Sequence, residues 1–131
     1  MSKSKSIFIV LFAYILSISA ILFTVQILNY SNILNVMIAD IVATIIIFIF
    51  SVYFRNSSIY DPYWSVIPPV ILFYFIYLNN GFNFQAFLLS FSVIFWGARL
   101  TFNWFRGWPG LHHEDWRYVE MRKVSGKYFQ F

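Results

Sequence analysis

Long apolar stretches separated by short polar ones make up most of this chain. A helix needs about 20 mainly apolar residues to cross a bilayer. Four stretches reach or approach that length, residues 7–28, 33–54, 63–78 and 84–105. The links at 29–32 and 79–83 are short and uncharged, so the helices on either side of each are predicted to form antiparallel hairpins. The pattern therefore predicts an all-α integral membrane protein, one membrane domain with four transmembrane helices.

The composition supports a membrane protein and excludes some kinds of reactive group and partner. Of the 131 residues 60% are hydrophobic and 11% are charged, against about 25% charged in soluble domains. The chain has no cysteine, which excludes disulfides and cysteine nucleophiles. The net charge of +4 comes from residues beside the apolar stretches, where they contact anionic lipid. We therefore expect membrane lipid as a partner and no nucleic acid.

The positions of the basic residues predict an orientation. They precede the first stretch, follow the second or follow the fourth, and the other two links contain none: Lys3, Lys5, Arg55, Arg106, Arg117, Arg122, Lys123 and Lys127. By the positive-inside rule both termini are predicted to be cytoplasmic. A cleaved signal peptide is an alternative for the N-terminus, but the apolar run continues to Leu28, beyond the length of a signal-peptide core.

Polar residues inside the apolar stretches are candidates for function, because burying them in lipid is costly. Trp96, Arg99, Asn103 and Arg106 are spaced 3, 4 and 3 apart and so share one helix face. This face is expected to line a polar pocket, although Arg99 snorkelling to the interface is the structural alternative. Asp40, in the second stretch, is expected to lie too near the outer side to pair with Arg99.

The start of the third stretch offers a better carboxylate. Asp61 precedes Pro62, an order that suits a helix cap followed by proline at the first helical position. From its expected depth we predict that Asp61 meets Arg99, with Tyr60 or Tyr63 as phenol donors nearby. A simple cap with an aromatic belt is the alternative.

The segment 106–127 is predicted to be cytoplasmic and to contain a short helix. A helix from about His113 places Asp115, Tyr118 and Arg122 on one face. An acid and an arginine together suit a nucleotide, because the carboxylate accepts from hydroxyl groups and the guanidinium pairs with phosphate. A solvated charged segment is the alternative. No metal site is predicted, because adjacent histidines point apart on a helix and no His-Glu-x-x-His pattern occurs.

Several motifs together resemble those of the DUF1295 membrane family, which has a steroid 5-alpha-reductase-like fold. The motifs occur in order at residues 61–65 (DPYWS), 96–104 (WGARLTFNW), 106–108 (RGW) and 113–118 (HEDWRY). Reductases of the wider superfamily carry a His-x-Asp segment with Arg-Lys seven residues after the Asp, which His113, Asp115, Arg122 and Lys123 match in spacing. The family's Asn two residues before the His corresponds here to Leu111.

This resemblance implies an NADPH-dependent reductase that reduces a double bond of a lipid or steroid-like enone, with a hydrophobic small-molecule substrate. The residues expected to contact the cofactor are Asn103, His113, Asp115, Arg117, Arg122 and Lys123. Those expected near the reacting group are Asp61, Tyr63 and Arg99. Trp96 matches the position of the superfamily's tyrosine acid, and an indole cannot act as a phenol does, so steroid reduction itself is not predicted.

Superfamily members are longer than this chain and place their second cofactor motif in later helices. The chain is therefore expected to be a truncated N-terminal half, inactive alone, whose partner is a C-terminal half or a second copy. One alternative is a complete four-helix transport or accessory protein in which Asp40 carries a proton. Another is the related branch of methyltransferases that use S-adenosylmethionine.

Overall fold

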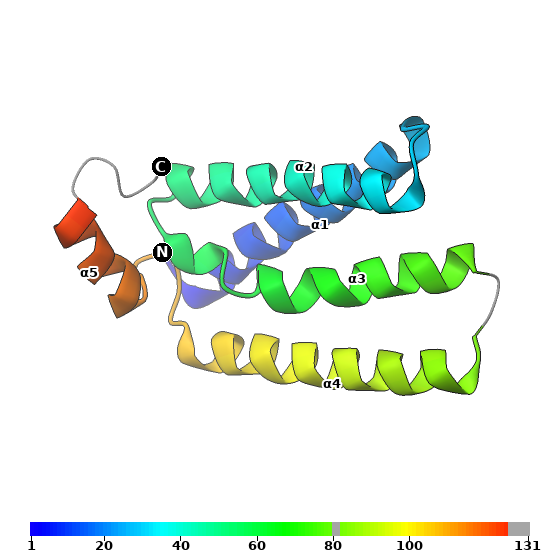
Figure 1. Ribbon diagram of the computed structural model, residues 1–131. Coiled ribbons are helices and arrows are strands. Elements are labelled where there is room, and N and C mark those ends of the chain that lie inside the picture. The colour runs from blue at the N-terminus through cyan, green and yellow to red at the C-terminus, as the bar shows by residue number, and fades with distance from the viewer. Residues whose placement is uncertain (80–81, 126–131) are drawn as a thin grey trace. The chain divides into compact units, whose positions relative to one another are not determined.

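The computed structural model describes residues 1–79 and 82–125 (Figure 1). It contains α-helices and one short 3-10 helix, and no strand within those described residues. Four helical segments are long and apolar enough to cross a membrane, which confirms the predicted class. The elements are α1 (Lys3–Ile27), α2 (Asn32–Tyr53), η1 (Ser57–Ile59), α3 (Tyr63–Leu78), α4 (Phe84–Gly107) and α5 (Trp116–Ser125).

The chain divides into two compact units, which are described separately. The first unit comprises Met1–Tyr60 and Pro109–Phe131, and the second comprises Asp61–Trp108. The first therefore contains α1, α2, η1 and α5, and the second contains α3 and α4. Lys127, which belongs to the predicted cytoplasmic segment, lies outside the described residues.

Helices α1 and α2 form the predicted hairpin in the first unit. Small residues line their contact, and a short side chain lets two helix backbones approach closely. The Ser17 hydroxyl donates to the carbonyl of Ala13 at 2.9 Å and lies 3.5 Å from the carbonyl of Ala43 on α2. The buried residues recur at helical spacing: Val10, Ala13, Tyr14, Ser17, Ile21 and Thr24 on α1, and Asn35, Ala39, Ala43, Ile47 and Ser51 on α2.

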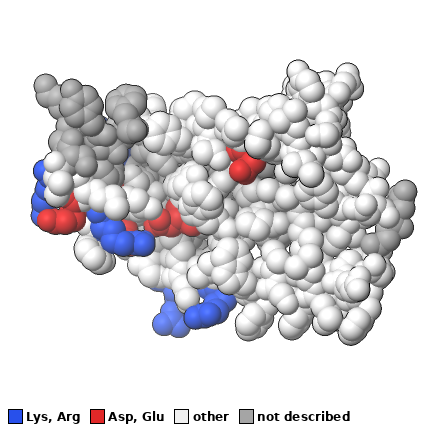
Figure 2. Space-filling model, viewed as in Figure 1, with Lys and Arg blue, Asp and Glu red and all other residues white. Residues whose placement is uncertain are grey.

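The outward faces of α1 and α2 are largely apolar, as expected in lipid. Phe8 and Ile33, for example, are 71% and 74% exposed. In Figure 2 charged side chains gather near the end of the first unit that carries α5, and much of the rest of the visible described surface is white.

Helix α2 ends in a Schellman motif that redirects the chain toward η1. Arg55 adopts a left-handed conformation (φ 50°), and its N–H donates to the carbonyl of Val52 at 3.1 Å. The next N–H, that of Asn56, donates to the carbonyl of Ser51 at 2.9 Å. Glycine is the usual residue at this left-handed position. Arginine gives no sequence signal for the motif.

Helices α3 and α4 form the second predicted hairpin, and a glycine brings them together. Pro69 cannot donate a helical hydrogen bond, which leaves the carbonyl of Ser65 without its usual partner. Gly97 lies against that carbonyl: a Cβ placed on Gly97 would be 2.5 Å from the Ser65 oxygen. The Ser65 hydroxyl donates to the carbonyl of Pro62 at 2.9 Å, so the Thr101 hydroxyl, 2.8 Å away, donates to Ser65.

The helix bounds differ from the predicted ones by a few residues. Helix α1 begins at Lys3 rather than at residue 7, because Ser2 accepts a hydrogen bond from the N–H of Lys5 and caps the helix. Helix α3 begins at Tyr63, so Pro62 occupies the cap position and Asp61 lies one residue before it. The predicted arrangement, with Asp61 as cap and Pro62 as first helical residue, was therefore shifted by one position.

Candidate functional site

The buried amide of Asn56 fixes the polar segment after Trp108 onto the end of α2. Its Nδ2 donates to the carbonyls of Leu111 and His113 at 3.1 and 2.9 Å. Its Oδ1 accepts from the N–H of Ser58 at 3.0 Å. Every hydrogen-bonding position on the amide except one lone pair is thus used, and the side chain is only 1% exposed. Asn56 therefore helps to hold the loop that precedes α5 against the end of α2.

Glu114 adds a second connection between the same two parts of the chain. Its Oε1 accepts from the N–H of Ser57 at 2.8 Å and from Nη2 of Arg122 at 2.9 Å. Beside it, the hydroxyl of Ser58 accepts from the N–H of Asp115 at 2.9 Å. The carboxylate is nearly buried, with 10% of the side chain exposed, so its bond to Arg122 is more than a surface ion pair. Glu114 thus holds both η1 and α5.

Asp115 caps α5. Its carbonyl accepts from the N–H groups of Tyr118 and Val119, and its carboxylate accepts from the N–H of Arg117 at 2.9 Å. The guanidinium of Arg117 also donates to that carboxylate, at 2.8 and 3.1 Å. The hydrogen bond from Arg117 lowers the pKa of Asp115 from its usual value. The carboxylate is therefore ionised at neutral pH and charge-paired.

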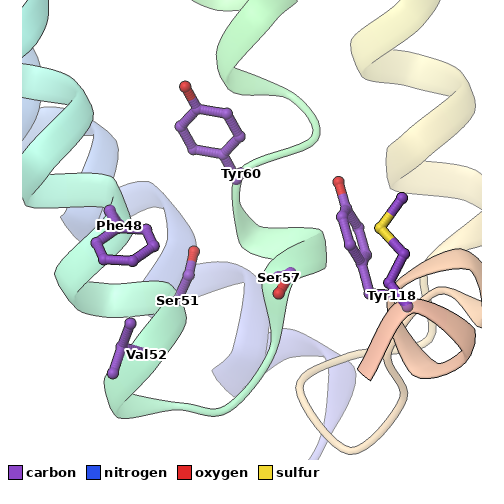
Figure 3. A pocket seen from close by; sticks show the side chains of 7 residues that line it. Phe48, Ser51, Val52, Ser57, Tyr60 and Tyr118 are labelled. Atoms are coloured by element: carbon purple, nitrogen blue, oxygen red, sulfur yellow. The ribbon is translucent and has the colours of Figure 1, made fainter. Parts of the chain in front are cut away.

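A cavity of about 240 Å³ lies beside this charged segment, within the first unit. Figure 3 shows Phe48, Ser51 and Val52 of α2 on one side and Tyr118 on the other, with Ser57 and Tyr60 between them. Met121 of α5 completes the lining. The Tyr60 phenol is hydrogen-bonded to the side chain of Thr44 on α2. The cavity is thus walled by both parts of the chain that Asn56 and Glu114 join.

Comparison with known proteins identifies the family. A family model described as a protein of unknown function, DUF1295, matches residues 47–131, more than half of the chain. The chain belongs to the DUF1295 family. The matched residues include the end of α2, η1 and α5, and hence all the lining residues of the cavity.

A curated relative of this DUF1295 chain comes from the yeast Schizosaccharomyces pombe and is named an uncharacterized protein. It is 30% identical over 82 residues, which is 60% of this chain. The match spans about a quarter, 24%, of the length of the yeast protein. No solved structure matches the chain.

The structure brings together the expected cofactor residues of the C-terminal segment of this DUF1295 chain. Asp115, Arg117, Arg122 and Lys123 lie on or just before α5. Lys123 is paired with Glu120 at 3.0 Å and is well exposed. His113 contributes its carbonyl to Asn56. Arg117, Arg122 and Lys123 carry positive charge, and each is paired with an acid, Asp115, Glu114 and Glu120 respectively.

The remaining predicted residues lie in the second unit. Tyr63 is buried at the start of α3, and Asp61 is half-buried just before it. Arg99 and Asn103 are exposed on α4. No ion pair joins Asp61 to Arg99 among the described residues, and the pairing expected from depth is not present in this structure.

The sequence patterns did not indicate that Asn56 and Glu114 would join the segment before α5 to the end of α2 and to η1. Asn56 is followed by two serines, a pattern typical of a local turn. The bond from the N–H of Ser58 to Asn56 Oδ1 forms such a turn, but it is only one of the bonds that Asn56 makes. Its partners at 111 and 113 are backbone carbonyls, which carry no residue signature. Within the described residues, no group of three or more acidic, cysteine or histidine side chains is arranged to hold a metal ion.

Proposed function

We propose that this DUF1295 chain forms part of an NADPH-dependent membrane reductase, with α5 as a contact for the anionic part of the cofactor. The main support for this proposal is that hydrogen bonds of Asn56, Glu114 and Ser58 hold the loop before α5 against the end of α2 and η1. The segment whose spacing matches the superfamily's cofactor motif is therefore already ordered. Order of this kind lowers the entropic cost of binding.

The donor set on α5 suits phosphate groups. Arg122, Arg117 and Lys123 present side chains that are 37%, 56% and 67% exposed. A guanidinium has five N–H donors, so pairing with one carboxylate does not exhaust it. NADPH, when bound, would supply a hydride to an activated double bond. The residues of this chain would hold its phosphates and orient it, and Asp115 would keep Arg117 in place.

We further propose that a hydrophobic double-bonded lipid is the substrate and that both termini are cytoplasmic. The apolar outer faces of α1 and α2 support exchange of such a molecule with the bilayer. Placing the nicotinamide requires groups beyond those on α5, which we propose come from a C-terminal half or from a second copy. This proposal includes Asp61, Tyr63 and Arg99 near the reacting group and Asn103 near the cofactor.

Fluorescence titration of the purified chain in lipid nanodiscs with NADPH tests the cofactor contact. We expect saturable binding, weakened about tenfold by Arg122→Ala, since a charge-assisted hydrogen bond contributes about 1.5–3 kcal/mol. Arg122→Lys should recover part of the loss because it keeps the charge.

Lys5→Ala is the matched control, because Lys5 is a basic residue of the same unit in the first turn of α1. It should leave NADPH binding unchanged. An equal loss with Lys5→Ala and Arg122→Ala would show unspecific attraction to positive charge. Absence of saturable NADPH binding by the unaltered chain would contradict the cofactor role of α5.

A further inference from the structure

One face of α4 carries basic and amide side chains that meet no other part of the described chain. Arg99, Asn103 and Arg106 are all exposed. Among residues 1–79 and 82–125, their side chains make no hydrogen bond or ion pair. In this they differ from the basic residues of α5, each of which is paired with an acid.

This face lies on the opposite side of α4 from α3. Gly97 and Thr101 face α3, where they meet the carbonyl and the hydroxyl of Ser65. At about 100° per residue, Arg99 lies about 200° around the helix from Gly97. Arg99 is also about 12 Å along the axis from the end of α4 at Gly107. A guanidinium at such a depth is costly in lipid unless an acceptor accompanies it.

The basic face continues along α4 as a strip of phenyl rings. Phe87, Phe91, Phe95, Arg99 and Asn103 follow one another at intervals of four, so they form one ridge of the helix. The rings of Phe87 and Phe91 stack with their centroids 6.5 Å apart, and those of Phe91 and Phe95 with theirs 6.2 Å apart. The three rings are 49%, 62% and 65% exposed. The ridge is therefore apolar along most of its length and cationic at one end.

The length of this ridge matches that of one lipid molecule. From Phe87 to Asn103 the helix rises about 24 Å. A bilayer with its headgroups is about 40–45 Å thick, so one lipid spans about 20–22 Å. Arg106 lies in the last turn of α4, and its side chain leans back toward Asn103 because helical side chains point toward the N-terminus. The guanidinium groups of Arg99 and Arg106 can therefore both approach an anion at the level of Asn103.

We propose that this face of α4 binds one phospholipid with a net negative headgroup. Its phosphate lies at the level of Asn103, where Arg99 and Arg106 donate to it, and one acyl chain lies along the three stacked rings. A second copy of the chain does not suit this face, because a symmetric contact would place arginine against arginine. The proposed reductase assigns Arg99 and Asn103 to substrate and cofactor. This inference does not rest on that assignment, and the experiment separates the two.

Native mass spectrometry of the delipidated chain in detergent counts bound lipids and tests the proposal. The matched probes are dioleoyl phosphatidylglycerol, which is anionic, and dioleoyl phosphatidylcholine, which has the same acyl chains and no net charge. We expect one molecule of phosphatidylglycerol to bind saturably, about tenfold more tightly than phosphatidylcholine. Glycerol 3-phosphate, which has no acyl chains, should not bind in the same range of concentration.

Substitutions of the basic residues test the headgroup contact. Arg99→Gln and Arg106→Gln should each weaken phosphatidylglycerol about three- to tenfold and leave phosphatidylcholine nearly unchanged, as expected for a lost charge-assisted hydrogen bond. Arg99→Lys should recover part of the loss because it keeps the charge. Lys5→Gln is the control, since Lys5 is an exposed basic residue of α1 in the first unit, and it should have no effect.

A further substitution tests the apolar strip. Phe91→Ala should weaken both lipids by a similar factor, because it removes the middle ring and leaves the arginines in place. Leu89→Ala is the control: Leu89 is 53% exposed and lies on another side of α4, so its loss should leave both affinities unchanged.

Three results would overturn the proposal. The first is equal affinity of the unaltered chain for the two lipids. The second is a preference for phosphatidylglycerol that survives the combined change of Arg99→Gln and Arg106→Gln in a chain that circular dichroism shows to be helical. The third is displacement of phosphatidylglycerol by NADPH, which would assign the two arginines to the cofactor and would support the reductase instead.

Discussion

A single buried amide, that of Asn56, carries much of the local order around the proposed site. It bonds to two carbonyls that lie 55 and 57 residues further along the chain. Both N–H groups of its Nδ2 donate to backbone carbonyls. If an oxygen replaced Nδ2, that oxygen would face two carbonyl oxygens with no proton between them. The consequence can be measured because a nearly isosteric change is available.

Asn56→Asp should destabilise the first unit by about 2–4 kcal/mol, because it buries a carboxylate against two carbonyls and removes two hydrogen bonds. Amide hydrogen exchange at residues 111–115 should accelerate more than exchange along α1. Thermal unfolding in the same detergent gives the loss of stability.

Asn83→Asp is the control for this change. Asn83 is exposed and caps α4, where its Oδ1 accepts from the N–H of Ala86 at 2.8 Å. Aspartate caps equally well and its charge suits a helix N-terminus, so stability should stay the same or rise slightly. A similar loss in both variants would mean that Asn56 has no special role.

At the scale of elements, each hairpin depends on small residues where its helices touch. In the first unit Ala39 and Ala43 are fully buried on α2, and in the second Gly97 meets the backbone of α3. Two glycines of α4 differ in their surroundings. Gly97 faces the Ser65 carbonyl, whereas a Cβ on Gly107 would meet nothing within 4 Å.

Gly97→Ala should therefore separate α3 from α4 and destabilise the second unit by about 1–3 kcal/mol, the usual cost of overpacking. Gly107→Ala should stabilise α4 by about 0.5–1 kcal/mol, because alanine favours helix. Unfolding of both variants by increasing sodium dodecyl sulfate, followed by circular dichroism, measures the difference. Equal effects of the two changes would contradict the close contact at Gly97.

Much of the fold could be predicted from the sequence because lipid imposes a simple rule on it. Helices that cross a membrane must be long, apolar and internally hydrogen-bonded, and this gave the four helices and both hairpins. The exact ends of helices and the contacts between individual side chains follow no such rule. The left-handed Arg55 ends α2 where a glycine would be expected, and the absent bond between Asp61 and Arg99 shows that similar depth does not bring two side chains together.

The candidate site was only partly predictable, for a related reason. The spacing predicted Asp115 and Arg122 as candidate cofactor contacts, but it did not show that Arg117 would pair with Asp115 or that Glu114 would pair with Arg122. The cavity was also missed. Its lining comes from α2, η1 and α5, and ordinary residues such as Val52 and Met121 give no sign that they face one another.

At the scale of the whole molecule, the absence of cysteine makes the proposed orientation easy to test. Tyr30 and Phe82 are both exposed and lie in or beside the links of the two hairpins. A single cysteine at either position should react with a membrane-impermeant maleimide on intact cells. Val124→Cys, at an 83% exposed position on α5, should react only after the membrane is opened. Labelling of Val124→Cys on intact cells would refute cytoplasmic termini.

The contact between Ser6 and the loop before α5 has a consequence for synthesis. The Ser6 hydroxyl accepts from the N–H of Leu111 at 3.1 Å, and Gly110 (φ 133°) lies so close that a Cβ there would be 2.9 Å from the same oxygen. These partners are 105 residues apart and belong to one unit. While the ribosome is still making α3 and α4, the Ser6 hydroxyl lacks the N–H of Leu111, and the Asn56 amide lacks the carbonyls of Leu111 and His113. The contacts that close the first unit therefore form only after the second unit has been synthesised.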